Sequence, residues 1–303
     1  MRLTKQDWLG VGAFLALWLG AVGYLAASGG DWTFPLISLG VFGVALSLIA
    51  WVTTLGAKAP AIEVTRPGLE SGAILAYLAL YALVFLGWGL GAARELVQAG
   101  PAQEGFVLAL KLGVHVLLPA LLLLALGARL APLFQARLGT RAFWATLIVL
   151  GALLLGLLAV VSPSLAQIAA LELPASLLPG LAVLTFVWLA LEAGFCEEFL
   201  FRAVLQTRLS ALFKSAWAGV AISSILFGLA HAPGLYLRGG PGVDGWSADP
   251  VQVVAYTIAT LAPISLFFGF VYARTKSLLL VILLHACVDV LPNMAEFYRT
   301  WFG

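Results

Sequence analysis

Two adjacent carboxylates and an arginine occur together inside an apolar stretch of this sequence. Glu197, Glu198 and Arg202 lie in the segment GFCEEFLFR, whose flanks are apolar enough to cross a membrane. An ionised side chain in hydrocarbon costs about 2.5–3.5 kcal/mol on insertion scales. Three such groups within six positions are therefore expected to pair with one another, to face water, or to take part in a reaction.

The spacing of these residues predicts different surroundings for the two carboxylates. Neighbouring residues of a helix point about 100° apart, so Glu197 and Glu198 do not share one face. Glu198 and Arg202 are four residues apart with the acid first, which is the favourable order for an ion pair. That pair would keep Glu198 ionised and leave Glu197 free to act as a general base. The alternative is a helix end whose charges reach the headgroups, which suits Arg202 better than the shorter acids.

Three further polar residues lie on two later apolar segments. His231 ends the motif FGLAH, while His285 and Asp289, in HACVD, are four residues apart and share a helix face. Taken alone, a histidine at a helix end is more often structural than catalytic. Together with Glu197, these residues supply what metal-free peptide hydrolysis requires, namely a general base, a partner that orients water, and donors for an oxyanion.

The composition places the chain in a membrane. It has 303 residues, of which 62% are hydrophobic and 10% charged, and its mean hydropathy is +1.06. A soluble domain carries roughly 25% charged residues, so this chain lacks the polar surface that water requires. The net charge of +2 comes without a basic stripe, which argues against nucleic acid as a partner. The two cysteines show neither a disulfide pattern nor the C-x-x-C spacing of a zinc site.

The apolar segments predict an all-α polytopic protein with about nine transmembrane helices. Each segment is long enough, or nearly so, to cross a hydrocarbon core of roughly 30 Å as a helix. They run near 8–27, 34–55, 71–93, 106–126, 143–161, 177–205, 217–231, 251–273 and 277–290. Residues 1–170 then hold five helices without a recognised motif, and residues 171–303 hold a four-helix catalytic core at the C-terminal end.

Loop charges predict that the N-terminus lies inside, because cytoplasmic loops carry an excess of Lys and Arg. In that orientation the outer loops and tail hold only Arg94, Arg238 and Arg299. The basic residues assigned to the inner side are Arg2, Lys5, Lys58, Arg66, Arg129, Arg137, Arg141, Arg208, Lys214, Arg274 and Lys276.

Two further features leave alternatives open. The Gly/Pro-rich stretch that follows His231 is either a lid over the site or a plain connector. Glu192 lies five positions before Glu197, on a different face of an α-helix, so it need not join the site. Lys111 and His115 either form a polar contact with Glu192 or have a structural role, and we favour the structural role.

The ordered motifs E-E-x-x-x-R, F-x-x-x-H and H-x-x-x-D resemble the CPBP family, over about residues 177–290. This family comprises the CAAX prenyl endopeptidases of type II and the bacteriocin-processing intramembrane proteases, also called ABI proteins. The resemblance implies that Glu197 activates water and that His231 helps to hold it. It also implies that Glu198 and Arg202 form a supporting pair, and that His285 and residue 289 stabilise the oxyanion.

One position departs from the pattern. Well-known members of the family have Asn where this chain has Asp289. An ionised aspartate cannot donate to an oxyanion. Asp289 is therefore either kept protonated by burial or accepts a hydrogen bond from the ring of His285 and orients it. We favour the orienting role.

The predicted function is an intramembrane endopeptidase of the glutamate type, in the inner (plasma) membrane as a multi-pass protein. Its partners would be the lipid bilayer and membrane-embedded or lipidated peptide or protein substrates, cut near the inner half of the bilayer, and no cofactor is expected. One alternative is a zinc-dependent intramembrane protease that uses Glu197, His231 and His285 as ligands, although HExxH is absent. Another is a non-enzymatic transporter, immunity protein or scaffold, because proton relays use the same residue types.

Overall fold

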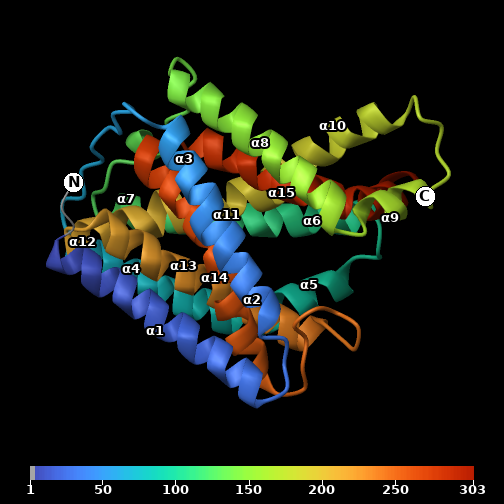
Figure 1. Cartoon of the computed structure of the whole chain (residues 1–303), viewed down its shortest axis with the longest axis horizontal. Coiled ribbons are helices and arrows are strands. Elements are labelled where there is room, and N and C mark those ends of the chain that lie inside the picture. The colour runs from blue at the N-terminus through green and yellow to red at the C-terminus, as the bar shows by residue number, and fades with distance from the viewer. Residues whose placement is uncertain (1–3) are drawn as a thin grey trace.

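The computed structural model describes residues 4–303, so Arg2 lies outside the described residues. Helices make up the regular structure of this range, and no strand occurs within it (Figure 1). Nine helical segments of residues 4–303 are long and apolar enough to cross a membrane. They are α1 (Lys5–Ala27), Thr33–Thr53, Pro67–Leu96, Pro101–Ala125, α8 (Arg141–Val161), Leu178–Phe213, α13 (Ala216–Arg238), α14 (Pro250–Thr275) and α15 (Leu278–Phe302). The prediction of an all-α polytopic membrane protein is confirmed.

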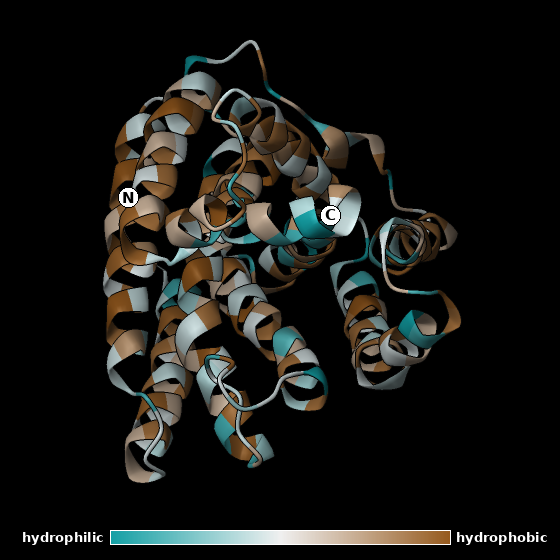
Figure 2. Cartoon of the chain, turned by 90° about the vertical axis from the view of Figure 1, so that its right-hand side faces the viewer, coloured by the Kyte–Doolittle hydropathy of each residue, from teal (hydrophilic) through white to brown (hydrophobic). Residues whose placement is uncertain are grey.

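The last helices form the centre of the molecule. Within the most apolar 18 residues of each span, 61% are buried in α14 and in α15, against at most 28% in each of the first five spans. In Figure 1, α14 and α15 run through the middle, with α1 along one side and α8 along another. Figure 2 shows apolar residues along the helices and hydrophilic ones mostly at their ends and in loops. The first five spans therefore expose their apolar side chains as a lipid-facing surface should.

Two predicted helix ends are wrong. The seventh and ninth spans do not stop near residues 231 and 290 but continue through Pro233 and Pro292 to Arg238 and Phe302. Proline interrupts a membrane helix less than a soluble one, because neighbouring helices satisfy the freed backbone groups. The Gly/Pro-rich loop therefore spans only residues 239–249 and begins two helical turns beyond His231.

The sixth span also extends further than expected, to Phe213. Arg208, which the loop pattern assigned to the inner loops, lies within this helix and is 1% exposed. Its Nε donates to Oε2 of Glu70 at 3.3 Å, and the Glu70 side chain is itself fully buried. A buried ion pair of this kind joins the third and sixth spans, and removal of either partner would leave an uncompensated charge.

The N-terminal helix α1 packs against α13 in the C-terminal half of the chain and is hydrogen-bonded to it. Thr4 and Asp7 form a capping box at the start of α1, and Asp7 Oδ1 accepts a hydrogen bond of 2.5 Å from Ser215, the N-cap of α13. A Cβ atom on Gly10 would meet the Cα of Ala218 at 2.5 Å. The two helices approach this closely only because residue 10 has no side chain.

Candidate active site

The span that carries the two glutamates is not a continuous α-helix. It consists of α10 (Leu178–Leu189), the π-helical turn η5 (Ala190–Phe195), α11 (Cys196–Glu198), the π-helical segment η6 (Phe199–Gln206) and α12 (Thr207–Phe213). In a π-helix the hydrogen bonds run from residue i to i+5, so residues five apart lie on nearly the same face. The helical register therefore changes on both sides of Glu197 and Glu198.

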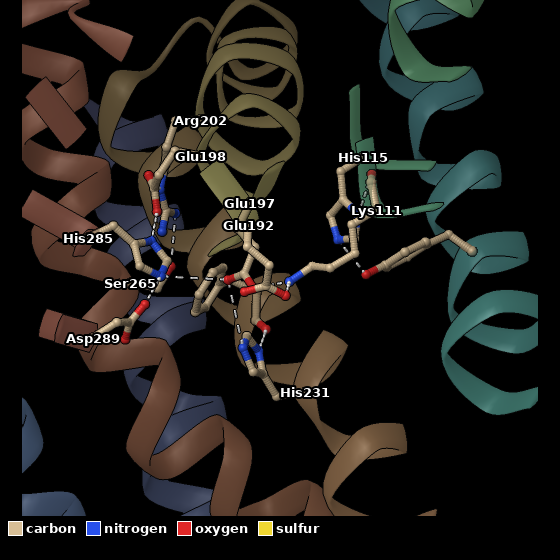
Figure 3. A network of polar contacts seen from close by, with 12 residues as sticks. Lys111, His115, Glu192, Glu197, Glu198, Arg202, His231, Ser265, His285 and Asp289 are labelled. Atoms are coloured by element: carbon tan, nitrogen blue, oxygen red, sulfur yellow. Dashed lines mark hydrogen bonds and ion pairs between the residues drawn. The ribbon is translucent and has the colours of Figure 1, made fainter. Parts of the chain in front are cut away.

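Glu198 lies in a closed polar network (Figure 3). Its Oε2 accepts from Nε of Arg202 at 2.9 Å, so the ion pair expected from the spacing is present, and both side chains are fully buried. Its Oε1 lies 2.8 Å from Nδ1 of His285, and Nη1 of Arg202 donates to the hydroxyl of Ser265 at 2.9 Å. Glu198 is thus held from both oxygens and has no freedom to reach a substrate.

Aromatic rings enclose this network. The Arg202 guanidinium lies 5.1 Å from the centre of the Phe227 ring and 6.0 Å from that of Phe268. The ring of His285 stacks on Phe268 with the centroids 5.1 Å apart and the planes inclined by 19°. Cation–π contacts and stacking stabilise these rotamers, and they keep water away from the ion pair.

Glu197 points in a different direction, as the 100° rotation between neighbours requires, and faces two imidazoles (Figure 3). Its Oε2 lies 3.9 Å from Nε2 of His231 and 3.9 Å from Nε2 of His285. These separations are too long for direct hydrogen bonds and suit groups that share a water molecule. The Glu197 side chain keeps 17% exposure, so solvent can reach it.

The hydrogen bonds of the two histidines define which ring nitrogens face Glu197. Nδ1 of His231 lies 2.8 Å from the carbonyl oxygen of Phe227, which can only accept, so Nδ1 carries the proton and Nε2 is turned toward Glu197. Nε2 of His285 lies 3.3 Å from Oδ2 of Asp289. His285 therefore has a carboxylate beside each ring nitrogen, which is the geometry an orienting role of Asp289 requires.

Sequence reasoning left Glu192 outside the site, yet it lies beside Glu197. Lys111 Nζ, at the end of α6 (Pro101–Lys111), contacts Glu192 Oε1 at 2.6 Å and Glu197 Oε1 at 3.9 Å. Glu192 and Glu197 share a face because the π-helical turn η5 lies between them, and five residues span about one turn of a π-helix. The sequence did contain a signal for this contact, since Glu192 and Lys111 are both charged residues within apolar spans and each needs a partner there.

Two further residues from the first five spans, His115 and Tyr81, lie next to Lys111 and contact each other. Nδ1 of His115 donates to the carbonyl oxygen of Lys111 at 3.1 Å, and the hydroxyl of Tyr81 lies 2.9 Å from His115 Nε2. Because His115 Nδ1 carries the proton, the Tyr81 hydroxyl is the donor to Nε2. These contacts place η2 (Tyr81–Gly89) and η3 (Leu112–Leu117) around the site.

Glu197 and His231 line a pocket of about 530 Å³. Its walls come from both parts of the chain, since Tyr81 and Lys111 line it as well, and it extends to Arg94, Arg238 and Asp244. Arg238 ends α13 and Asp244 lies in the loop 239–249. The pocket therefore opens on the side of the membrane that the charge pattern assigns to the outside. The sequence had predicted cleavage near the inner half of the bilayer. That prediction used only the depth of each residue along its helix, which does not show at which end of the helices a pocket opens.

The zinc alternative finds little support in the arrangement of donors. Within residues 4–303, no group of three or more His, Cys, Asp or Glu side chains could hold a metal ion. Nδ1 of His285 is engaged by Glu198, and its Nε2 faces Asp289. Both ring nitrogens of His285 therefore already lie beside carboxylates.

Comparison with known proteins agrees with the motifs. The family model described as type II CAAX prenyl endopeptidase Rce1-like matches residues 178–291, the segment that contains all six predicted site residues. No curated protein and no solved structure matches the chain. The family match confirms the resemblance and indicates a peptidase, and the nine apolar helices of residues 4–303 make it a multi-pass membrane protein. The first five spans, including Lys111, lie outside the matched segment.

Proposed function

We propose that this chain, whose segment 178–291 belongs to the type II CAAX prenyl endopeptidase Rce1-like family, is an intramembrane endopeptidase of the glutamate type. It hydrolyses peptide bonds of membrane-embedded or lipidated substrates in the plasma membrane, without a metal ion. One observation carries the proposal. Glu197 is partly exposed in a pocket with two imidazole nitrogens 3.9 Å away, whereas its neighbour Glu198 is locked in an ion pair.

Glu197 is the general base in this proposal. A water molecule beside Glu197 Oε2 and His231 Nε2 gives its proton to the carboxylate, and its oxygen attacks the carbonyl carbon of the substrate. His231 is suited to orient the water, because its Nδ1–H is bonded to Phe227 and its Nε2 is left for the water. Glu197 then returns the proton to the leaving amine nitrogen when the C–N bond breaks.

His285 stabilises the oxyanion of the tetrahedral intermediate. Glu198 accepts from Nδ1 of this ring, so an imidazolium presents its second N–H, on Nε2, toward the side of Glu197. Asp289, at 3.3 Å, orients that nitrogen in the resting state and yields to the oxyanion during the reaction. A donor aimed in advance at the developing charge is typically worth 10²- to 10³-fold in rate.

Lys111 is a positioning residue of the same site. Its ammonium lies between Glu192 and Glu197, at 2.6 Å and 3.9 Å, and supplies a positive charge for two partly buried carboxylates. The site contains nearly as many positive as negative charges. The cations are Arg202, Lys111 and an imidazolium at His285, and the acids are Glu192, Glu197, Glu198 and Asp289. This near balance of charge makes the cluster tolerable in a medium of low dielectric.

The test compares the membrane proteomes of cells that produce the wild-type chain and a Glu197→Gln variant. We expect cleavage products that appear only with the wild type. Cleavage of a substrate found in this way, in proteoliposomes, should fall by about 10²- to 10⁴-fold in Glu197→Gln and in His231→Ala. Glu296→Gln, which changes an exposed acid of α15, is the matched control and should cleave normally.

Unchanged cleavage by Glu197→Gln, with the protein folded and inserted, would refute the proposal. Loss of cleavage in the presence of a chelator, restored by zinc, would establish the zinc-dependent alternative instead. Proton-coupled uptake into the same proteoliposomes, without any cleavage, would establish a transporter.

A further inference from the structure

A second pocket lies at the opposite end of the helices from the opening of the candidate active site. Its volume is about 770 Å³, and it is bounded by residues 52–58 after the second span, by residues 137–145 at the start of α8, and by the last turn of α14. Charge in the loops assigns this end to the inner side of the membrane. Apart from the last turn of α14, its walls lie outside the segment that matches the protease family.

Four cations line this basic pocket, and no acidic residue does. The cations are Lys58, Arg137, Arg141 and Arg274. Across residues 4–303, none of them forms an ion pair with a carboxylate, in contrast to Arg202 and Arg208. Like charges that converge without counter-ions repel one another, so a bound anion would stabilise the arrangement.

The guanidinium groups of Arg137 and Arg274 are fixed by hydrogen bonds and keep further N–H donors unused. Nη2 of Arg137 donates to the carbonyl oxygen of Lys58 at 3.0 Å. Arg274 donates from Nε to the Thr54 hydroxyl at 3.2 Å and from Nη2 to the Thr54 carbonyl at 3.0 Å. A guanidinium has five N–H donors, so each arginine keeps several for a ligand. Both side chains are half-buried, which limits competition from water.

A helix start adds to the positive potential of the pocket. α8 is a helix of 21 residues that begins at Arg141, and Thr140, Arg141 and Ala142 all line the pocket. The Thr140 hydroxyl caps one backbone donor, that of Phe143, at 3.3 Å. The remaining N–H groups of the first turn and the helix dipole favour an anion at this point.

The surroundings of the basic pocket are those of a lipid–water interface. Val52 and Leu55 line it and are 56% and 58% exposed. Trp51 and Trp144, on α3 (Ser47–Thr53) and α8, expose about half of their surfaces, as interfacial tryptophans do. An anion that binds here therefore has apolar side chains beside it, which suit acyl chains rather than bulk water.

From these observations, we propose that the basic pocket binds the phosphate headgroup of an anionic phospholipid of the inner leaflet. Basic pockets between transmembrane helices on the cytoplasmic side are a known means of headgroup binding. The phosphate lies among the four cations and the start of α8, and the acyl chains run along α3 and α8. The bound lipid would join the ends of the second span, α8 and α14, which come from both parts of the chain.

The test measures lipid binding by the full-length protein, purified in neutral detergent and mixed with phosphatidylglycerol or phosphatidylcholine. Native mass spectrometry should show phosphatidylglycerol retained in preference, and thermal unfolding should shift upward with phosphatidylglycerol alone. The variant Lys58→Gln/Arg141→Gln should weaken phosphatidylglycerol binding by about tenfold or more, since each cation contributes on the order of 1 kcal/mol. Both side chains are exposed and form no hydrogen bond within residues 4–303, so the fold is retained.

The matched control is Arg129→Gln, an exposed cation of the same side that does not line the pocket. It should bind phosphatidylglycerol as the wild type does. Equal losses in the control and the double variant, or no preference over phosphatidylcholine, would overturn the proposal. An equal thermal shift with inorganic phosphate would also overturn it, because the pocket would then take a free anion. None of these measurements depends on proteolysis.

Discussion

At the scale of single residues, two chemically identical side chains receive different surroundings. Glu198 is fully buried and bonded through both oxygens, whereas Glu197 is 17% exposed and its Oε2 is not within hydrogen-bond distance of either imidazole. One acid is therefore part of the scaffold and the other is available for proton transfer. The two neighbouring carboxylates differ in role because they point in different directions from the helix axis and because each lies beside a different cation.

The buried ion pair predicts a large loss of stability in Glu198→Gln. The substitution keeps the shape but removes the charge that compensates Arg202, whose side chain is fully buried. A buried charge without its partner costs about 3–5 kcal/mol. Thermal or denaturant unfolding in detergent measures the difference in the free energy of unfolding.

The matched change is Glu296→Gln, which removes an acid from a pair with Arg299 whose side chains are 55% and 74% exposed. Exposed pairs contribute about 0–1 kcal/mol. Equal effects of Glu198→Gln and Glu296→Gln would contradict the structural role of the Glu198 pair.

At the scale of helices, two features bring the candidate catalytic groups together. The π-helical turn η5 rotates Glu192 onto the face of Glu197, where both reach Lys111. Three residues before Glu197, Gly194 lets the helix touch α15, because a Cβ on residue 194 would meet the carbonyl oxygen of Ile282 at 2.9 Å. His285 lies less than one turn further along α15. This close approach is what positions His285 beside both glutamates.

Gly194→Ala should therefore move the two helices apart and lower the catalytic rate. A displacement near 1 Å at a catalytic site can cost about 10²-fold, and overpacking also lowers stability by roughly 1–3 kcal/mol. Cleavage kinetics and unfolding are measured on the same preparation. Gly180→Ala, in α10 of the same span with nothing within 4 Å of the added Cβ, should retain activity. Full activity of Gly194→Ala would show that the contact does not position the site.

At the scale of the whole molecule, the pocket is a joint product of both parts of the chain. Residues 178–291 match the protease family and supply Glu192, Glu197 and His231 to its lining, while Lys111 and Tyr81 come from earlier spans. The division at residue 170 stays a prediction, and the pocket takes its lining residues from both sides of it. The earlier spans supply one wall of the site as well as the lipid-facing surface.

Lys111→Met tests this contribution. Without the ammonium, Glu192 and Glu197 face each other with no counter-ion, which is costly in low dielectric. We expect the carboxylates to shift and kcat to fall roughly 10- to 100-fold, with a smaller change in KM. The double variant Lys111→Met/Glu192→Gln removes one acid together with the cation, and it should recover part of the loss. An unchanged kcat in Lys111→Met would limit Lys111 to a structural role.

Much of the architecture was readable from the sequence. Long apolar runs predict membrane helices because backbone groups in lipid must be satisfied within the helix, and the nine spans of residues 4–303 agree with the predicted count. The ends near Pro233 and Pro292 were missed, because a proline seen in the sequence does not show whether neighbouring helices compensate for it.

The ordered motifs predicted the resemblance that the match over residues 178–291 bears out. The separate directions of Glu197 and Glu198 and the ion pair with Arg202 followed from local spacing on a helix. Three features became visible in the folded chain alone: Glu192 and Lys111 lie beside Glu197, the pocket of Glu197 extends to Arg238, and four cations share a second pocket. They depend on a π-helical change of register and on contacts between spans far apart in the chain, which local spacing does not specify. A periodicity of 3.6 residues carries no information about either.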